Sequence, residues 1–258
     1  MVVLEVKKLT FGYRKEPILR DIYLKVHEGE FLSIIGPNGS GKSTLLKCIC
    51  GMLRPWSGTI YINGVETSKL SRQEVQKIIS YLPQETTPPP SLMSVYEFIL
   101  LGRLQYLSGK LRVSNDDLEA VNEVINLLNL KEYVGRFVNE LSGGEKQLVY
   151  LAQALVKKPE ILLLDEPLNH LDIKNQFKVL SLLKMLSKNL GLSIVMVMHD
   201  INQAARYSDK IVILNNGKIL AEGYPDEVII PEILEKVYGI RFRVIYDGKI
   251  PQVIPLGW

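Results

Sequence analysis

The sequence predicts an α/β fold in which a mostly parallel core sheet follows N-terminal antiparallel strands and is interrupted by an inserted helical subdomain. A glycine-rich loop lies between an apolar strand and an amphipathic helix. Two later apolar runs, Ile161–Leu164 and Ile194–Met198, end in polar residues, as buried parallel strands do at the edge that binds ligands. A proline-rich stretch before them introduces a long segment with helical periodicity.

The glycine-rich loop fits the phosphate-binding pattern G-x-x-x-x-G-K-[ST]. Its residues are Gly36, Pro37, Asn38, Gly39, Ser40, Gly41, Lys42, Ser43 and Thr44. The glycines let the backbone close around a phosphate, and successive N–H groups and the following helix N-terminus attract its charge. Lys42 supplies a cation for the β- and γ-phosphates, and Ser43 supplies a hydroxyl for Mg²⁺. The flanking strand Phe31–Ile35 and helix Leu45–Leu53 favour this site over a flexible Gly/Ser turn.

Short strands are predicted before the loop at Val2–Val6 and Ile22–Val26. A third, Ser57–Ile62, follows the helix and ends in a tight Asn63-Gly64 turn. Tyr13 lies between the first two strands. An aromatic ring exposed there either stacks on an adenine base or covers the core, and the local sequence favours neither.

Gln84 follows the predicted strand Ile79–Leu82, which comes after a short helix capped by Ser71 and Glu74. At such a strand end the amide reaches Mg²⁺ or a water at the γ-phosphate. Standing alone, a glutamine there is more often an ordinary polar loop residue.

A lobe boundary is predicted at Thr86–Pro90, because three consecutive prolines continue neither a strand nor a helix. Helical patterns then run to about residue 157. Capping boxes at Ser94–Glu97 and Ser114–Asp117 open two helices, of which the first reaches about Tyr106.

Ser142, Gly143 and Gly144 precede a helical apolar stripe, Leu148–Leu155. Small residues and free N–H groups at a helix N-terminus make a second candidate anion site. A simple helix cap is the favoured interpretation of these three residues taken alone.

Asp165 and Glu166 follow the apolar run Ile161–Leu164. Asp165 is a candidate Mg²⁺ ligand, directly or through water, and Glu166 is a candidate for orienting and activating the attacking water. The alternative is a pair that caps the next segment. His199 ends the run Ile194–Met198 and is expected in the same crevice, where an imidazole donates to the γ-phosphate.

The chain has 258 residues, of which 47% are hydrophobic, so a sizeable core is expected. Its net charge of +3 is too small to argue for a nucleic-acid partner. No apolar run exceeds five residues, whereas a membrane span needs about 18, and no secretory signal is expected. Cys48 and Cys50 lie two apart on one predicted helix, which favours small apolar residues in a reducing cytoplasm over a disulfide or metal pair.

Together these motifs resemble the ATP-binding cassette (ABC) ATPases, a P-loop NTPase family, over residues 1–230. The phosphate loop alone indicates only a nucleotide, whereas the ordered set of motifs is specific. In chain order the set is Walker A at Gly36–Thr44, the Q-loop at Gln84, the signature at Leu141–Glu145, Walker B at Ile161–Glu166, the D-loop at Leu168–Asp172 and the switch at His199.

The resemblance implies two cassettes packed head to tail around two ATP molecules. Walker A of one chain and Ser142, Gly143 and Gly144 of the other would hold each ATP. Tyr13 would stack on adenine, and Asp172 would contact the opposite site. The residues implied for phosphates, Mg²⁺ and water are Lys42, Ser43, Gln84, Asp165, Glu166 and His199.

Within the family, the chain looks like the importers of metal chelates such as iron–siderophore, haem and cobalamin. The likeness rests on residues 94–103, 169–172 and 237–239. It implies a homodimer, two integral membrane permease subunits whose coupling helix meets residues 86–106, and an extracytoplasmic substrate-binding protein. The chain would then be peripheral, at the cytoplasmic face of the inner membrane.

The implied domain organisation is an ABC ATPase domain at 1–230 and a short C-terminal extension, helix plus hairpin, at 231–258. The ATPase domain would comprise a core lobe, residues 1–85 and 158–230, and a helical subdomain, residues 86–157.

Leu168, Gln153 and Glu145 stand where Thr, Arg and Gln are common in the family, and none of the three changes removes a group that hydrolysis needs. The alternative function is a soluble ABC ATPase acting on ribosomes, DNA ends or Fe–S assembly. One cassette with a short insert and no heptad run disfavours it. Glu166 and His199 together disfavour a nucleotide-binding regulator without turnover. An oxyanion importer would look the same in this chain.

Overall fold

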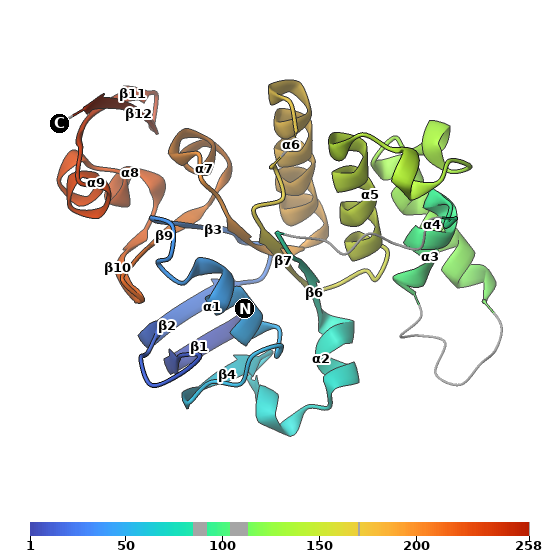
Figure 1. Ribbon diagram of the computed structural model, residues 1–258, viewed down its shortest axis with the longest axis horizontal. Helices are drawn as coiled ribbons and strands as arrows, with labels where there is room; N and C mark the ends of the chain where they lie inside the picture. Colours follow the sequence, from blue (N-terminus) through green and yellow to red (C-terminus); the bar gives the residue numbers. More distant parts are fainter. Residues whose placement is uncertain (85–91, 104–112, 170, 258) are drawn as a thin grey trace.

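The structure is a computed structural model that describes residues 1–84, 92–103, 113–169 and 171–257 (Figure 1). A six-stranded sheet lies at its centre, with strand order β10-β9-β3-β8-β7-β6. Its strands are β3 (Phe31–Ile35), β6 (Ile79–Leu82), β7 (Ile161–Asp165), β8 (Ser193–Val197), β9 (Lys210–Asn215) and β10 (Lys218–Gly223). All neighbours pair in parallel except β9 and β10, which form a hairpin. The predicted mostly parallel core sheet is therefore confirmed.

The central strands are continuous apolar runs because both faces of the sheet are covered. Strands β3, β7 and β8 are buried at every position. In β7, Leu162 and Leu164 pack into one apolar cluster, whereas Ile161 and Leu163 pack into the other. Alternating side chains of one strand thus fill two cores, which is why no polar position interrupts the run.

A second, antiparallel sheet has the order β2-β1-β4-β5. Its strands are β1 (Val2–Phe11), β2 (Leu19–His27), β4 (Ser57–Ile62) and β5 (Val65–Glu66). The predicted bounds of the first two strands were too short. Lys8 is exposed and has a φ of 50°, and the pairing of β1 with β2 shifts register next to it. Strand β1 nevertheless continues, because Leu9 and Phe11 are buried beyond this point.

Nine helices lie within the described part of the chain. They are α1 (Lys42–Ile49), α2 (Arg72–Ile78), α3 (Val95–Leu101), α4 (Asn115–Leu127), α5 (Gly143–Leu155), α6 (Ile173–Leu190), α7 (Ile201–Tyr207), α8 (Pro225–Val228) and α9 (Pro231–Tyr238). Short 3₁₀ turns occur at Thr67–Lys69, Lys131–Tyr133 and Val138–Glu140. No helix among the described residues has both the length and the apolar character that crossing a membrane requires.

The predicted capping boxes at Ser71, Ser94 and Ser114 are confirmed. The helix opened by Ser94 is shorter than predicted and ends at Leu101. A Cβ atom on the next residue, Gly102, would lie 2.5 Å from the Val156 side chain, so the chain turns here in close contact with the end of α5. Tyr106, residues 86–90 and His170 lie outside the described residues.

The C-terminal strands β11 (Arg241–Asp247) and β12 (Ile250–Gly257) form the predicted hairpin, beside α7, α8 and α9 in Figure 1. Asn202, at the start of α7, fixes it there. The Asn202 side chain donates to the Val253 carbonyl at 3.2 Å and accepts from the Val253 amide at 2.6 Å. The hairpin is therefore anchored three residues after His199.

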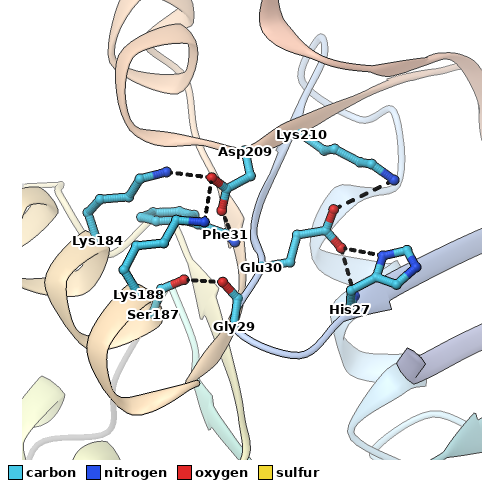
Figure 2. A network of polar contacts seen from close by, with 9 residues as sticks. All are labelled: His27, Gly29, Glu30, Phe31, Lys184, Ser187, Lys188, Asp209 and Lys210. Carbon is cyan, nitrogen blue, oxygen red and sulfur yellow. Dashed lines mark hydrogen bonds and ion pairs between the residues drawn. The ribbon is translucent and has the colours of Figure 1, made fainter. Parts of the chain in front are cut away.

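Polar contacts tie α6 to the amino ends of β3 and β9 (Figure 2). The Asp209 carboxylate accepts from the Phe31 amide at 2.9 Å, and it pairs with Lys184 at 2.8 Å and Lys188 at 2.9 Å. The Ser187 hydroxyl donates to a carbonyl in the turn before β3. This network holds the C-terminal half of α6 against the sheet, on the side away from the loops described next.

Candidate functional site

The sequence-predicted catalytic residues meet at the carboxyl edge of the parallel sheet. Residues 36–44 follow β3, Gln84 follows β6, Asp165 ends β7 with Glu166 next to it, and His199 follows β8. Parallel strands that are neighbours end at the same edge, so four segments distant in sequence converge there. They line a crevice of about 410 Å³ in front of the N-terminus of α1.

The phosphate loop has the backbone that its glycines permit. Gly36, Gly39 and Gly41 have φ of 148°, 77° and 106°. A Cβ atom at Gly36 would lie 2.0 Å from the Leu214 carbonyl oxygen, so only glycine fits there. The buried Ser40 hydroxyl has no hydrogen-bond partner among the described residues. A cradle of this shape with an unpartnered hydroxyl fits a bound phosphate.

Lys42 is buried under this loop, and its ammonium donates to the carbonyls of Gly36 and Pro37, each at 2.9 Å. Burial lowers the pKa of Lys42, and the carboxylates of Glu166 and Asp165 oppose that shift. The ammonium of Lys42 is therefore already positioned at the loop when a phosphate binds there.

Asp165 is the most buried acid of the site, and its two oxygens have different partners. Oδ1 accepts from the Ser43 hydroxyl at 2.9 Å, and Oδ2 accepts from the Tyr81 hydroxyl at 3.2 Å. Burial raises the pKa of Asp165, the two hydroxyl donors lower it, and neighbouring Glu166 raises it further. A divalent cation fits beside the Ser43 and Asp165 oxygens, because its charge would offset the repulsion between the carboxylates of Asp165 and Glu166.

Glu166 occupies an unusual backbone position and is held by three donors. Its φ is 52°, in the left-handed region that non-glycine residues seldom adopt. Oε1 lies 2.6 Å from Nε2 of His199. Oε2 accepts from the amides of Gln84 at 2.7 Å and Asn169 at 2.9 Å. The strained backbone thus turns the carboxylate into the crevice rather than along the strand.

The sequence assigned no site role to Tyr81, and it placed Asn169 in the D-loop without a contact to Glu166. Tyr81 reaches Asp165 because β6 and β7 are neighbours, with Tyr81 paired to Leu163 in the register. The only local signal for Tyr81 is that alternate residues of a strand share a face, which puts it with Ile79 on the side of the cluster that contains Leu45 of α1. Asn169 follows Glu166 by three residues, a spacing that a turn closes.

Tyr13 is exposed, and its ring packs edge-on against Phe11 with the centroids 5.2 Å apart. It does not number among the residues that line the crevice, whereas Ile18 from the same loop does. The contact with Phe11 holds the ring at the surface, and stacking on a base stays a prediction.

Ser142, Gly143 and Gly144 form the N-terminus of α5, as predicted. The Ser142 hydroxyl accepts from the Glu145 amide at 3.4 Å, and the Glu145 carboxylate accepts from the Ser142 amide at 2.7 Å. The cap interpretation is therefore confirmed. An accepting hydroxyl still carries a proton to donate, so the anion site stays a prediction. Asp172 caps α6 by accepting from the Asn175 amide at 2.7 Å, without a reciprocal bond to its own amide.

A family model described as ABC transporter matches residues 19–169. The chain belongs to the ABC transporter family. The matched range is more than half of this cassette, and it contains Walker A, the Q-loop, the signature and Walker B.

Individual relatives match the ABC cassette over almost its whole length. An uncharacterized ABC transporter ATP-binding protein of Methanocaldococcus jannaschii is 44% identical and covers 100% of this chain and 99% of its own. The iron(3+)-hydroxamate import ATP-binding protein FhuC of Bacillus subtilis is 37% identical, over 95% of this chain and 91% of its own.

A solved structure described as an inward-facing conformation of a putative metal-chelate type ABC transporter aligns with a TM-score of 0.86 and 27% identity. It covers 99% of the cassette and 98% of its own chain. These findings confirm the predicted ABC ATPase fold, and the prediction that the cassette is an ATPase whose ATP hydrolysis drives transport.

Proposed function

We propose that this cassette powers the uptake of a metal chelate, such as an iron–siderophore, haem or cobalamin, through partner membrane subunits. The family assignment supports the role as a transport motor. The cargo class is supported by the relatives, because the iron(3+)-hydroxamate import protein aligns over 95% of this chain. The metal-chelate type transporter that aligns over 99% of the chain supports the same class.

The convergence of His199, Gln84 and Asn169 on Glu166 carries the proposed chemistry. Glu166 acts as the general base that takes a proton from the attacking water. Its three donors fix the carboxylate, so the water finds it already oriented. Lys42 stabilises charge on the β- and γ-phosphates, and His199 donates to the γ-phosphate.

Mg²⁺ is proposed as the metal of the site, held by Ser43 and Asp165 with Gln84 nearby. When bound, it neutralises phosphate charge. The contact between the Ser43 hydroxyl and Oδ1 of Asp165 supports this set, since both are oxygen ligands of the kind that Mg²⁺ prefers.

We further propose that the working form is a homodimer with ATP at its interface. The described residues that line the crevice come from the phosphate loop, Ile18, Gln84, Glu166 and His199, and the set contains none of Ser142, Gly143 and Gly144. Those three residues then complete the site of the partner chain, where Asp172 also contacts the nucleotide-bearing subunit. Tyr13 stacks on the adenine of its own chain's ATP.

The proposed partners are two integral membrane permease subunits, fed by an extracytoplasmic substrate-binding protein. The cassette then lies at the cytoplasmic face of the inner membrane. The proposed organisation keeps the ATPase domain at residues 1–230, with its helical subdomain at 86–157 contacting the permease, and the extension at 231–258.

A pull-down from native membranes with this chain as bait tests the proposal. Recovery of a polytopic membrane subunit, with a binding protein encoded or captured beside it, is the expected result. Recovery of ribosomal proteins, DNA-repair factors or Fe–S assembly proteins without a permease would favour the soluble alternative. Binding of oxyanions rather than chelates by the captured binding protein would overturn the cargo class alone.

A further inference from the structure

Hydrogen bonds and short stretches of backbone together form a closed ring beside the nucleotide crevice, and two glutamines complete it. The ring surrounds a small polar cavity of about 140 Å³. Five polar side chains of the ring line this cavity, namely Glu166, Asn169, Gln176, His199 and Gln203.

The ring begins at the carboxylate of Glu166. Of its three donors, Gln84 and His199 also have proposed tasks at the nucleotide, and these tasks compete with their contacts to Glu166. Asn169 has no such task, and it remains as the group that holds Oε2, at 2.9 Å. The orientation of the base during turnover therefore depends on where the D-loop places Asn169.

Gln176 on α6 fixes the D-loop on both sides of Asn169. Its amide nitrogen donates to the carbonyl of Leu171 at 3.1 Å and to that of Leu168 at 3.4 Å. Because the nitrogen of Gln176 is used by these carbonyls, its oxygen is left as an acceptor. The polar network of Asp209 holds the other half of α6, so Gln176 projects from an anchored helix.

Gln203 on α7 supplies the donor for that oxygen. Nε2 of Gln203 lies 2.8 Å from Oε1 of Gln176. Gln203 follows His199 by four residues, and the Asp200 carboxylate caps the turn between them by accepting from the Asn202 and Gln203 amides. A shift of the histidine segment is thus transmitted to Gln203, and from Gln203 to Gln176.

We propose that Gln176 and Gln203 are positioning residues that couple the switch-histidine segment to the D-loop, so that the base Glu166 and His199 move as one unit. Neither glutamine touches the nucleotide crevice. Their effect is on the placement of Asn169 and His199, and through these on the rate of the chemical step. This inference rests on the proposed ATPase mechanism.

The test uses Gln176→Met, Gln203→Met and the double variant, in the cassette assembled with its membrane partners. Methionine keeps the length of the side chain and removes the amide. Each single variant is expected to lower kcat about tenfold while the KM for ATP stays within about twofold. The kcat of the double variant is expected to lie within about twofold of the kcat of the slower single variant, because both changes break the same chain of contacts. Gln73→Met, exposed on α2, is the matched control and keeps the wild-type kcat.

A kcat within about twofold of wild type for both single variants overturns the proposal. So does a double variant whose loss is the product of the two single losses, since the glutamines would then act independently. Weak ATP binding or a Tm lowered by several degrees in the single variants indicates a merely structural role and also overturns it. If the wild-type assembly does not hydrolyse ATP, the proposed function itself is wrong, and this inference with it.

Discussion

Oε1 of Glu166 lies 2.6 Å from Nε2 of His199, although the two residues follow different strands of the sheet. The same carboxylate accepts from Gln84 and Asn169 through its other oxygen. Before nucleotide binds, every oxygen of the proposed base is therefore occupied by a donor. Nucleotide binding must exchange some of these contacts, which links the readiness of the base to occupancy of the crevice.

The first prediction concerns the base itself. Glu166→Gln is expected to lower kcat by a factor of about 10² or more, because an amide does not take the proton from water. ATP binding is retained, so an ATP-bound dimer accumulates and is seen by size-exclusion chromatography. ATPase activity near that of wild type would show that another group is the base.

A second prediction concerns the signature helix. Ser142→Arg is expected to abolish hydrolysis by obstructing the partner's site, while the isolated monomer binds ATP as the wild type does. Ser71→Arg is the matched control, because Ser71 caps α2 through the same capping box. It loses a cap of about 1 kcal/mol without losing turnover. Loss of ATP binding by the Ser142→Arg monomer would contradict the assignment in trans.

A third prediction concerns the metal. Tyr81→Phe keeps the ring and removes the hydroxyl that binds Oδ2 of Asp165. The half-saturating Mg²⁺ concentration is expected to rise several-fold, because the carboxylate is free to rotate away from the metal. Binding of ATP in EDTA should not change, and calorimetry with and without Mg²⁺ separates the two. An equal loss of ATP affinity with and without Mg²⁺ would show that the Tyr81 hydroxyl supports the structure of the site rather than the binding of the metal.

A fourth prediction concerns pH and the network of Figure 2. Burial alone would raise the pKa of Asp209, but hydrogen bonds from Lys184, the Phe31 amide and Lys188 outweigh it and hold the pKa below its ordinary value. The charged carboxylate therefore stabilises the fold above its unfolded pKa of about 3.9, and this contribution is lost as the pH falls through the lower folded pKa.

Asp209→Ala is accordingly expected to cost about 2 kcal/mol of unfolding free energy at pH 7. The difference from wild type should shrink as the pH drops below about 4. Urea denaturation of both proteins at a series of pH values measures it. A difference that does not vary with pH would show that the carboxylate acts only through packing.

Much of the site was predictable because it depends on local chemistry. The glycines of residues 36–44 lie at a strand–helix junction, which is where a phosphate-binding loop is expected. Asp165 and Glu166 follow an apolar run that indicates a strand buried on both faces of the sheet. The capping boxes at Ser71, Ser94 and Ser114 and the helix cap at Ser142 were likewise predictable, since each depends on residues close together in the chain. Predictions that needed distant partners fared worse, as with β1, which continues past Lys8 because the core beyond it buries Phe11.

The sequence by itself determined the parallel sheet, the phosphate loop and the identity of the acids, because periodicity and motif spacing are properties of neighbouring residues. Only the tertiary structure decided that Tyr81 pairs with Asp165 and that Gln203 and Gln176 connect His199 to the D-loop. Strand order and helix docking bring these side chains together. A contact between residues far apart in the chain depends on how the elements pack, and no local pattern contains that information.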